Sequence, residues 1–464
     1  MEEKLLEVLG AIGSYLWGWP MLVMLVGTGV YLTVLLRGIQ FSQAIPAFKL
    51  IFFNPKGRAK GDISHFQALM TALSATVGTG NIAGVATAIA AGGPGAIFWM
   101  WLTGLLGMAT KFSEAVLAVH YRETNGDGEM SGGPMYYMTN GLNMKWLAII
   151  FSLCLAVAAI GIGNMVQSNS MALLVKDTFA IPTWVTGAIL TVLAAVVILG
   201  GIKRIGSVAS TLVPIMILMY VGAGTIILIL NIDMIPTIFS TIFESAFSPI
   251  AATGGFAGAA VKEVVRQGLS RGVFSNESGM GSSPIAAAAA KTKHPVEQAL
   301  VSMTQTFIDT LVVCTFTGLI ILSSGLWTTG VNGAELTGQA FSSGLQGIQF
   351  GGYNVGGMIV SVCLLFFAFS TIIGWGYYGI KGITFIFGKK AILPYHIIFI
   401  GSVMLGALMK LDLAWSIAEV CTGLMIIPNL FALVLLSRKV KELTIDYFRH
   451  EKDGKGYMVK PFYK

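Results

Sequence analysis

The run Ser74-Ala75-Thr76-Val77-Gly78-Thr79-Gly80-Asn81 interrupts the otherwise apolar stretch 66–91. A second run, Phe274-Ser275-Asn276-Glu277-Ser278-Gly279-Met280-Gly281-Ser282-Ser283-Pro284, interrupts the stretch 250–290. Glycine and small polar residues are poor helix formers. In lipid, unpaired backbone groups cost several kcal/mol each, so broken helices persist only where they line a cavity or bind something. The two runs therefore predict two discontinuous membrane helices.

The composition supports a membrane environment. Of the 464 residues, 55% are hydrophobic and only 11% are charged, whereas soluble domains carry roughly 25% charged residues. The mean hydropathy of +0.77 agrees. A soluble chain of this length would need a polar surface that this sequence does not supply, so we expect an integral membrane protein.

A membrane-spanning helix needs about 20 mostly apolar residues. Eleven stretches qualify: 14–36, 66–91, 95–121, 146–174, 182–200, 207–231, 250–290, 296–324, 355–384, 391–409 and 413–437. The seventh is too long and too rich in Gly and Ser for one continuous helix. The predicted fold class is therefore all-α, with eleven transmembrane helices, two of them discontinuous.

Basic residues fall on alternate loops between these stretches. One set of loops holds Arg37, Lys49, Lys56, Arg58, Lys60, Arg122, Lys203, Arg204, Lys291, Lys293, Lys381, Lys389 and Lys390, and the tail adds eight more. The opposite loops hold Lys4, Lys176 and Lys410. Because cytoplasmic loops carry the excess of Lys and Arg, we predict a multi-pass protein of the cell membrane with its N-terminus outside and its C-terminus in the cytoplasm. Basic residues beside Gly-rich sequence in 232–275 indicate a re-entrant or interfacial helix there.

Several function classes are disfavoured. The net charge of +7 resides in short loops, where it sets topology, so we expect no nucleic-acid partner. The four cysteines form no CxxC pair and the histidines form no cluster, so neither a disulfide scaffold nor a zinc site is indicated. No nucleophile–base pair lies at membrane depth, so we do not expect an enzyme. Nothing indicates an obligate protein partner.

The two interruptions occupy matching places in the order of spans. Five spans counted from 66–91 end near residue 231, and five counted from 250–290 end near residue 437. Because five is odd, the second block is inverted relative to the first, and paired broken helices in inverted halves point to a transporter site. We divide the chain into an extra helix with its linker (1–60), two repeats (61–231 and 232–437) and a basic cytoplasmic tail (438–464).

A broken helix offers two kinds of polar backbone. The half after the break presents N–H groups and a positive dipole end, which suit a carboxylate. The half before it presents carbonyls, which suit Na⁺ or an ammonium group. Hard cations prefer oxygen ligands, and both interruptions are rich in hydroxyls and carboxamides. A zwitterionic amino acid bound beside Na⁺ matches both ends.

Four side chains near the breaks have open roles. Gln167 lies on a polar helix face that either lines the pocket or makes interhelical hydrogen bonds. Phe274 and Trp375 either cap a pocket for small side chains or serve in packing or lipid contact. An intramembrane carboxylate is a functional candidate, and Glu277 could contact the substrate ammonium, carry a proton or cap a helix end.

The motifs resemble a known family of transporters. Residues 75–81 resemble the unwound first core helix of LeuT-type sodium symporters. The run Gly-Leu-Ser-Arg-Gly-Val-Phe-Ser-Asn-Glu-Ser-Gly-Met-Gly-Ser at 268–282 resembles the alanine or glycine:cation symporter family, as do the Gly-rich runs 79–84, 92–95 and 374–379. The resemblance extends from about residue 60 to residue 437 and implies a LeuT-type 5+5 inverted repeat with Na⁺- or H⁺-coupled uptake of alanine or glycine.

The resemblance also implies a set of binding residues. The substrate site would comprise Thr79, Gly80, Gln167, Phe274, Ser275, Asn276, Glu277 and Trp375, with the amides of Thr79 and Gly80 holding the carboxylate. A first Na⁺ would be bound by the Thr76 carbonyl and by Asn81, Ser275 and Thr306. A second Na⁺ would be bound by the carbonyls of Ser74 and Val77 and the hydroxyls of Ser370 and Thr371. Glu277 departs from the LeuT-type pattern, which has no carboxylate at that place.

Other classes remain as alternatives. An H⁺-coupled transporter would use an intramembrane carboxylate, for which Asp309 and Glu419 are further candidates. An ion channel would need a continuous polar stripe or a filter ring, and the chain has broken helices instead. The expected partners are a small amino acid, Na⁺ and the lipid bilayer. The residues do not separate alanine from glycine, or Na⁺ from H⁺.

Overall fold

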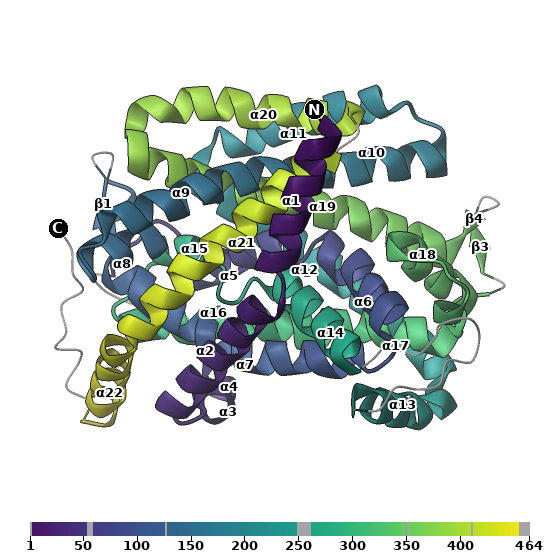
Figure 1. Cartoon of the computed structure of the whole chain (residues 1–464), viewed down its shortest axis with the longest axis horizontal. Coiled ribbons are helices and arrows are strands. Elements are labelled where there is room, and N and C mark those ends of the chain that lie inside the picture. The colour runs from purple at the N-terminus through teal and green to yellow at the C-terminus, as the bar shows by residue number, and fades with distance from the viewer. Residues whose placement is uncertain are drawn as a thin grey trace.

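The computed structural model describes residues 2–52, 59–125, 128–247, 261–346, 348–350, 353–409 and 412–453. Helices dominate these ranges (Figure 1). Within them, the strands form two short antiparallel hairpins. The hairpins join β1 (Glu123–Thr124) to β2 (Met130–Ser131), with Glu123 opposite Ser131, and β3 (Gln349–Phe350) to β4 (Tyr353–Asn354), with Gln349 opposite Asn354. The all-α class is confirmed.

Eight helical stretches in the described ranges are long and apolar enough to cross a membrane. They are Lys4–Leu35, Ala96–His120, Lys145–Lys176, Gly201–Leu230, Pro295–Ser324, Val355–Phe387, Lys389–Leu408 and Trp415–Leu435. A ninth span results if the pair His65–Thr76 and Gly80–Gly92, bent by 54°, counts as one. The chain is thus a multi-pass membrane protein.

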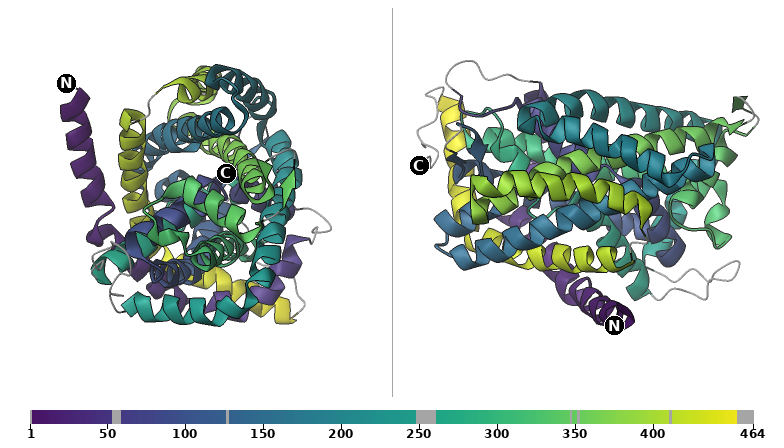
Figure 2. Two further views of the ribbon diagram at one scale, coloured as in Figure 1. Left: turned by 90° about the vertical axis from the view of Figure 1, so that its right-hand side faces the viewer. Right: turned by 90° about the horizontal axis from the view of Figure 1, so that it is seen from above.

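The first apolar stretch begins well before the predicted start at residue 14. It contains α1 (Glu2–Leu16) and α2 (Trp19–Leu35), and α3 (Ile39–Ser42) and α4 (Ala44–Ile51) follow it. Helix α1 contacts α21 (Asp412–Leu435) and projects from the rest of the molecule (Figure 2).

The predicted first block contains a run of helices whose bounds agree with the five predicted spans to within about six residues. They are α5 (His65–Thr76), η1 (Gly80–Gly84), α6 (Val85–Gly92), α7 (Ala96–His120), α8 (Pro134–Asn140), α9 (Lys145–Ile160), η2 (Gly161–Met165), α10 (Val166–Phe179), α11 (Thr183–Ile198) and α12 (Gly201–Leu230), and η3 (Ile232–Met234) follows them at the start of the second block. Segments η1 and η2 are π-helical. Helix α11 has 16 residues, which is short for a full span.

The remaining helices lie in the predicted second block and the tail. They are α13 (Ile235–Phe247), α14 (Val261–Asn276), α15 (Pro284–Ala288), α16 (Pro295–Thr306), η4 (Phe307–Cys314), α17 (Thr315–Ser324), η5 (Leu326–Thr328), α18 (Gly333–Gly344), α19 (Val355–Phe387), η6 (Lys389–Ala391), α20 (Ile392–Leu408), α21 and α22 (Ser437–Asp453). Segment η4 is π-helical. The break expected in 250–290 separates α14 from α15, while residues 248–260 lie outside the described ranges.

Helices α13 and α22 of this second set are not among the stretches long and apolar enough to cross a membrane. Helix α13 has 13 residues with one buried face, which fits the interfacial helix expected in 232–275. Helix α22 buries Leu443 and Tyr447, so the described part of the basic tail is an amphipathic helix docked on the body.

Glycines let the helices around the breaks approach closely, as in other membrane bundles. A Cβ atom on Gly107 of α7 would lie 2.6 Å from Ser278 Oγ in the second break. A Cβ atom on Gly374 of α19 would lie 2.9 Å from the backbone nitrogen of Ala75 in α5. Helices α7 and α19 are therefore packed directly against the two broken helices.

The linkers next to the two broken helices pair with each other. Residues 60–63, before α5, run along residues 289–292, after α15, and the Asp62 amide donates to the Ala289 carbonyl at 2.7 Å. Arg122, fully buried beyond the end of α7, ties both linkers together. Its guanidinium donates to the carbonyls of Lys60, Ala288 and Ala290 at 2.7 to 2.8 Å. We call this arrangement the linker clasp.

Candidate functional site

The first break opens directly after Thr76. Val77 has an extended backbone (φ −76°, ψ 96°), which turns its carbonyl out of the helical hydrogen-bonding pattern. The Gly78 N–H then donates to Asn81 Oδ1 at 2.9 Å. The side chain of Asn81 thus holds the turn that leads from α5 into η1.

The second break runs over residues 277–283. Gly279 (φ 86°) and Gly281 (φ 80°) adopt left-handed backbone conformations that glycine tolerates. Glu277 has φ 56°, a conformation that costs a residue with a Cβ about 1–2 kcal/mol. Its carbonyl accepts a hydrogen bond from Lys111 Nζ at 3.0 Å, and its carboxylate accepts one from the Ser282 hydroxyl. The surroundings therefore hold Glu277 in its strained conformation.

Three buried side chains from α7 and α21 anchor this second break. They are Lys111, Glu114 and Asn429. In addition to its bond to the Glu277 carbonyl, Lys111 Nζ donates to the Ser283 hydroxyl at 2.5 Å. Glu114 Oε1 accepts from the Gly281 N–H at 3.0 Å and from Asn429 Nδ2 at 2.7 Å. Lys111 and Glu114 lie one helical turn apart, yet each bonds to the break or its anchors rather than to the other. The predicted interruption is thus a rigid, specifically held segment.

A small pocket lies between the two breaks and has a cavity volume of about 20 Å³. This is room for about one water molecule and far less than the about 300–1,000 Å³ of open ligand pockets, so the pocket is nearly closed in this conformation. Its wall consists of Ala75, Thr76, Gly78, Thr79, Gly80, Ile162, Gln167, Phe274, Glu277, Met280, Thr371 and Trp375. Six of the eight residues predicted for the substrate site line it; the two that do not are Ser275 and Asn276.

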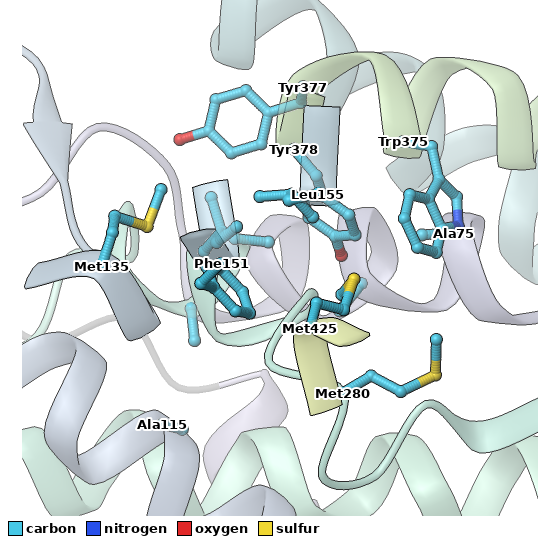
Figure 3. Packing of buried hydrophobic residues seen from close by; sticks show 14 of the residues in the cluster. Ala75, Ala115, Met135, Phe151, Leu155, Met280, Trp375, Tyr377, Tyr378 and Met425 are labelled. Atoms are coloured by element: carbon cyan, nitrogen blue, oxygen red, sulfur yellow. The ribbon is translucent and has the colours of Figure 1, made fainter. Parts of the chain in front are cut away.

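Much of the pocket wall is apolar, with Ile162, Phe274, Met280 and Trp375 among its residues. Trp375 extends from α19 beside Ala75, and Met280 lies on the loop of the second break (Figure 3). A Cβ atom on Gly163 of η2 would lie 2.5 Å from Trp375 Cγ, so the indole packs directly on the η2 backbone. Gln167 Nε2 donates to Thr79 Oγ1 at 3.3 Å and to the Ile162 carbonyl at 3.1 Å, which joins η1 to this wall.

A fully buried carboxylate, Asp309 of η4, connects the two breaks. Asp309 Oδ1 accepts from Asn81 Nδ2 at 2.7 Å. Asp309 Oδ2 accepts from the hydroxyls of Ser275 at 2.9 Å and Thr310 at 2.8 Å. Cys314 Sγ lies 3.3 Å from both Asn81 Nδ2 and Ser275 Oγ. No ion pair of Asp309 occurs among the described residues.

Asn276 and Thr306 lie outside this cluster. The Thr306 hydroxyl is 3.2 Å from Ser278 Oγ, and Asn276 Oδ1 accepts from the Ser278 N–H at 2.9 Å. Both side chains are buried beside the second break. Of the side chains predicted for the first Na⁺ site, the structure gathers Asn81 and Ser275 on Asp309 and places the hydroxyl of Thr306 with Ser278 instead.

The residues predicted for a second Na⁺ site lie where α19 crosses α5. Thr371 faces the first break, because a Cβ atom on Gly78 would lie 2.6 Å from its hydroxyl oxygen. The hydroxyls of Ser370 and Thr371 donate to the Phe367 carbonyl at 2.8 and 3.0 Å. Ser74 Oγ donates to the Thr71 carbonyl at 2.7 Å. All three hydroxyls are thus bonded to their own helices, as is common for Ser and Thr.

Sequence reasoning missed the partners of several of these groups. Asp309 stood out as an intramembrane carboxylate, but nothing near it in the chain indicates Asn81 or Ser275, which lie 228 and 34 residues away. Asn429 carried no signal, because a single Asn in an apolar span does not indicate what it contacts. A fixed polar framework therefore surrounds a small, partly apolar pocket.

Known proteins with similar sequences are named as transporters. The sequence model of the sodium:alanine symporter family matches residues 2–461. The sodium/alanine symporter AgcS of Methanococcus maripaludis is 49% identical over 440 residues, 93% of this chain and 94% of the relative. An uncharacterized transporter of Haemophilus influenzae is 49% identical over 448 residues, 96% of this chain and 97% of the relative. The probable sodium/glutamine symporter GlnT of Bacillus subtilis is 38% identical over 466 residues, 100% of this chain and 94% of the relative. The chain therefore belongs to the sodium:alanine symporter family.

Proposed function

We propose that this protein is a secondary active symporter that couples Na⁺ entry to the uptake of a small amino acid, alanine and/or glycine. The observation that carries the proposal is the narrow pocket between two broken helices, with helix-start amides on one side and Glu277 on another. The names of two relatives, a sodium/alanine symporter and a probable sodium/glutamine symporter, support the coupling ion and the substrate class.

The proposed substrate pose follows from the charges around the pocket. Amides in the first turn of a helix have no acceptor within it, so Thr79 and Gly80 at the start of Gly80–Gly92 would bind the substrate carboxylate. The Glu277 carboxylate would bind its ammonium group. Phe274 and Trp375 narrow the pocket, which would exclude a long side chain, and Gln167 supports Thr79 through their 3.3 Å contact. Ser275 and Asn276 do not line the pocket and would support the residues that do.

The first Na⁺ would bind where the breaks meet. We propose the Thr76 carbonyl, Asn81 and Ser275 as ligands, with Thr306 beside them, and add Asp309 as the anionic group. A buried carboxylate is costly without a positive partner, and Asp309 already contacts Asn81 and Ser275 at 2.7 and 2.9 Å. Oxygen-rich surroundings suit a hard cation such as Na⁺.

The second Na⁺ would bind between α5 and α19. The carbonyls of Ser74 and Val77 and the hydroxyls of Ser370 and Thr371 are the proposed ligands. Support comes from the extended Val77, whose carbonyl has left the helical pattern, and from the close approach of Thr371 to Gly78. Hydroxyl oxygens that donate to their own helix still offer lone pairs to a cation.

We further propose eleven spans, with α11 and the α14–α15 pair completing the set. Residues 61–231 and 232–437 would form inverted five-helix repeats, with 1–60 and 438–464 outside them. Support comes from the bent α5–η1–α6 unit in the first block and the broken α14–α15 unit in the second. The basic loops favour an external N-terminus and a cytoplasmic C-terminus. Transport would proceed by alternating access around the midplane pocket.

The test is uptake of radiolabelled alanine into proteoliposomes with and without an inward Na⁺ gradient. We expect accumulation above equilibrium only with the gradient, and competition by unlabelled glycine. Because Na⁺ and substrate share a site, each should tighten binding of the other by the same factor. Failure to accumulate alanine or glycine would contradict the proposal.

H⁺ coupling is a second candidate, because Glu277 and Asp309 are both buried carboxylates near the pocket. Repeating the uptake with an inward H⁺ gradient in Na⁺-free buffer separates the two. Accumulation under that gradient alone would assign H⁺ as the coupling ion and leave the amino-acid assignment in place.

A further inference from the structure

Four buried polar residues follow one face of the helix formed by α16 and η4. They are Gln298, Ser302, Gln305 and Asp309, with exposed fractions of 1%, 8%, 0% and 0%. Their spacing of four, three and four residues places them on a single helical stripe. Polar residues in such a row are costly inside a membrane bundle and mark ion or substrate pathways when they occur.

Three of these four residues form hydrogen bonds with α5 or η1. At one end Gln298 Oε1 lies 2.5 Å from His65 Nδ1. In the middle Gln305 Nε2 donates to Thr76 Oγ1 at 3.2 Å. At the other end Asp309 accepts from Asn81 at 2.7 Å. Within the stripe, Gln298 Nε2 donates to Ser302 Oγ at 3.2 Å. We call this interface the α5–α16 seam.

The seam is not fully satisfied by protein groups. His65 Nε2 and Gln305 Oε1 are buried and have no hydrogen-bond partner in the described part of the chain. Leaving a buried polar atom without a partner costs about 1–3 kcal/mol, and such atoms in native proteins are usually met by water or an ion. A seam that served only to pack two helices would not need these groups.

The two ends of the seam differ in chemistry. One end reaches Thr76, which lines the pocket, and Asp309, the proposed anionic ligand. The other end lies at His65, next to the linker clasp. There Glu297 accepts from the Thr292 hydroxyl at 2.8 Å and the Lys293 amide at 3.0 Å. A carboxylate thus stands at each end of a row of amide and hydroxyl groups.

We propose that the α5–α16 seam is a hydrated path along which the coupling cation passes between the site beside Asp309 and the face of the membrane at His65. In the proposed orientation this face is the cytoplasm, so the seam releases the cation after inward opening. This inference rests on the proposed symport. Amide, hydroxyl and carboxylate oxygens are suitable transient ligands for Na⁺, and a path needs several weak sites rather than one strong site.

The test compares two modes of transport. Net Na⁺-driven uptake requires the cation to leave on the far side, whereas alanine–alanine exchange with saturating Na⁺ on both sides does not. Ser302→Ala and Gln305→Met remove polar groups of the seam with little change in volume. We expect net uptake to fall about tenfold or more, while exchange stays within about twofold of the unsubstituted protein.

Thr304→Val is the matched control. Thr304 is also buried in α16, but its hydroxyl donates to the Val301 carbonyl of its own helix at 2.7 Å and takes no part in the seam. Both modes should be retained in this variant. Equilibrium alanine binding in the presence of Na⁺ verifies that each variant is folded.

Three outcomes would overturn the path: an equal loss of exchange and net uptake, no change in either mode, or the same selective loss in Thr304→Val. Absence of Na⁺-driven uptake in the unsubstituted protein would instead overturn the symport on which the path rests. The two failures are therefore distinguishable in one set of vesicles.

Discussion

Glu277 combines a left-handed backbone, burial and a place in the pocket wall within one residue. Strained residues persist where the surroundings over-determine them, and they cluster at binding sites. Lys111 Nζ donates to the backbone carbonyl of Glu277 at 3.0 Å. The carboxylate of Glu277 is therefore available to the Ser282 hydroxyl and to a ligand in the pocket. The strain is therefore consistent with a fixed position for a recognition group.

Glu277→Gln should raise the KM for alanine about 10- to 100-fold, because a hydrogen bond between charged groups contributes about 1.5–3 kcal/mol. The measurement is initial uptake against alanine concentration at saturating Na⁺. Glu244→Gln, on an exposed side chain of α13, is the control and should leave KM unchanged. An unchanged KM in Glu277→Gln would remove this carboxylate from substrate recognition.

Asp309→Asn should act on the cation. We expect the Na⁺ concentration for half-maximal uptake to rise about tenfold, because about 1.4 kcal/mol of ion binding would be lost. Asn81→Ala should also reduce Na⁺-dependent uptake, but it removes the bond to the Gly78 N–H as well. Asp309→Asn is therefore the sharper variant. Na⁺ activation that stays normal in Asp309→Asn would contradict the proposed anionic ligand.

Residue-level prediction from the sequence succeeded where the signal was local. Gly78, Gly279 and Gly281 indicate broken helices, because glycine destabilises the interior of a continuous helix. The grouping of Asn81, Ser275 and Asp309 could not be foreseen, because these residues come from three separate helices and share no spacing rule. Which of the predicted ligands meet is a property of helix packing.

Three π-helical segments among the described helices each contribute to the site. Segment η1 carries Asn81, η2 carries Ile162 and Gly163, and η4 carries Asp309. A π-helical turn inserts an extra residue into a helix and often marks a functional position. In each case the residue that reaches the site lies within the π-helical segment itself.

Gly163→Ala should reduce uptake about tenfold or more, because the added methyl group would lie 2.5 Å from Trp375 Cγ and displace the indole that closes the pocket. Gly401→Ala in α20 is the control, since a Cβ atom there meets nothing within 4 Å. That control should be neutral, or more stable by about 0.5–1 kcal/mol. Equal uptake by both variants would mean that the position of Trp375 does not set transport.

The predicted spans match most helices, and the differences have physical causes. Residues 95–121 and 355–384 were predicted closely, as α7 (Ala96–His120) and α19 (Val355–Phe387) show. Helix α14 has only 16 residues and carries Lys262, Arg266 and Arg271, so it is too short and too polar to stand out as an apolar span. None of the π-helical segments was predicted, since a one-residue insertion leaves apolar periodicity nearly unchanged.

At the scale of the whole molecule, α22 packs on the body near His294. This histidine precedes α16 outside the apolar spans, accepts a hydrogen bond from the Val296 N–H at 3.2 Å and packs against Tyr447 of α22. Burial, and then the neighbouring His120 and His450, lower the pKa of His294 to about 3 from 6.5. The folded protein thus keeps this imidazole neutral.

Acidification should therefore destabilise the protein. The unfolded chain binds a proton at His294 below about pH 6.5 while the folded chain does not until about pH 3, so stability falls as pH drops through this window. At pH 5 the loss is about 2 kcal/mol, reduced in part by Asp446, 3.7 Å away. Thermal unfolding measured between about pH 7 and pH 5 tests this. In His294→Asn, which keeps a capping oxygen, the pH dependence should be weaker; an unchanged slope would assign it elsewhere.

The linker clasp has a mechanical consequence. The segments that lead into α5 and out of α15 are hydrogen-bonded to each other and to Arg122, so one half-helix cannot swing away without pulling the other. Slippage, in which the ion crosses alone, would require just such independent motion. A fixed ratio of ions to substrate would then depend on the hydrogen bonds of the linker clasp, in addition to the binding affinities in the pocket.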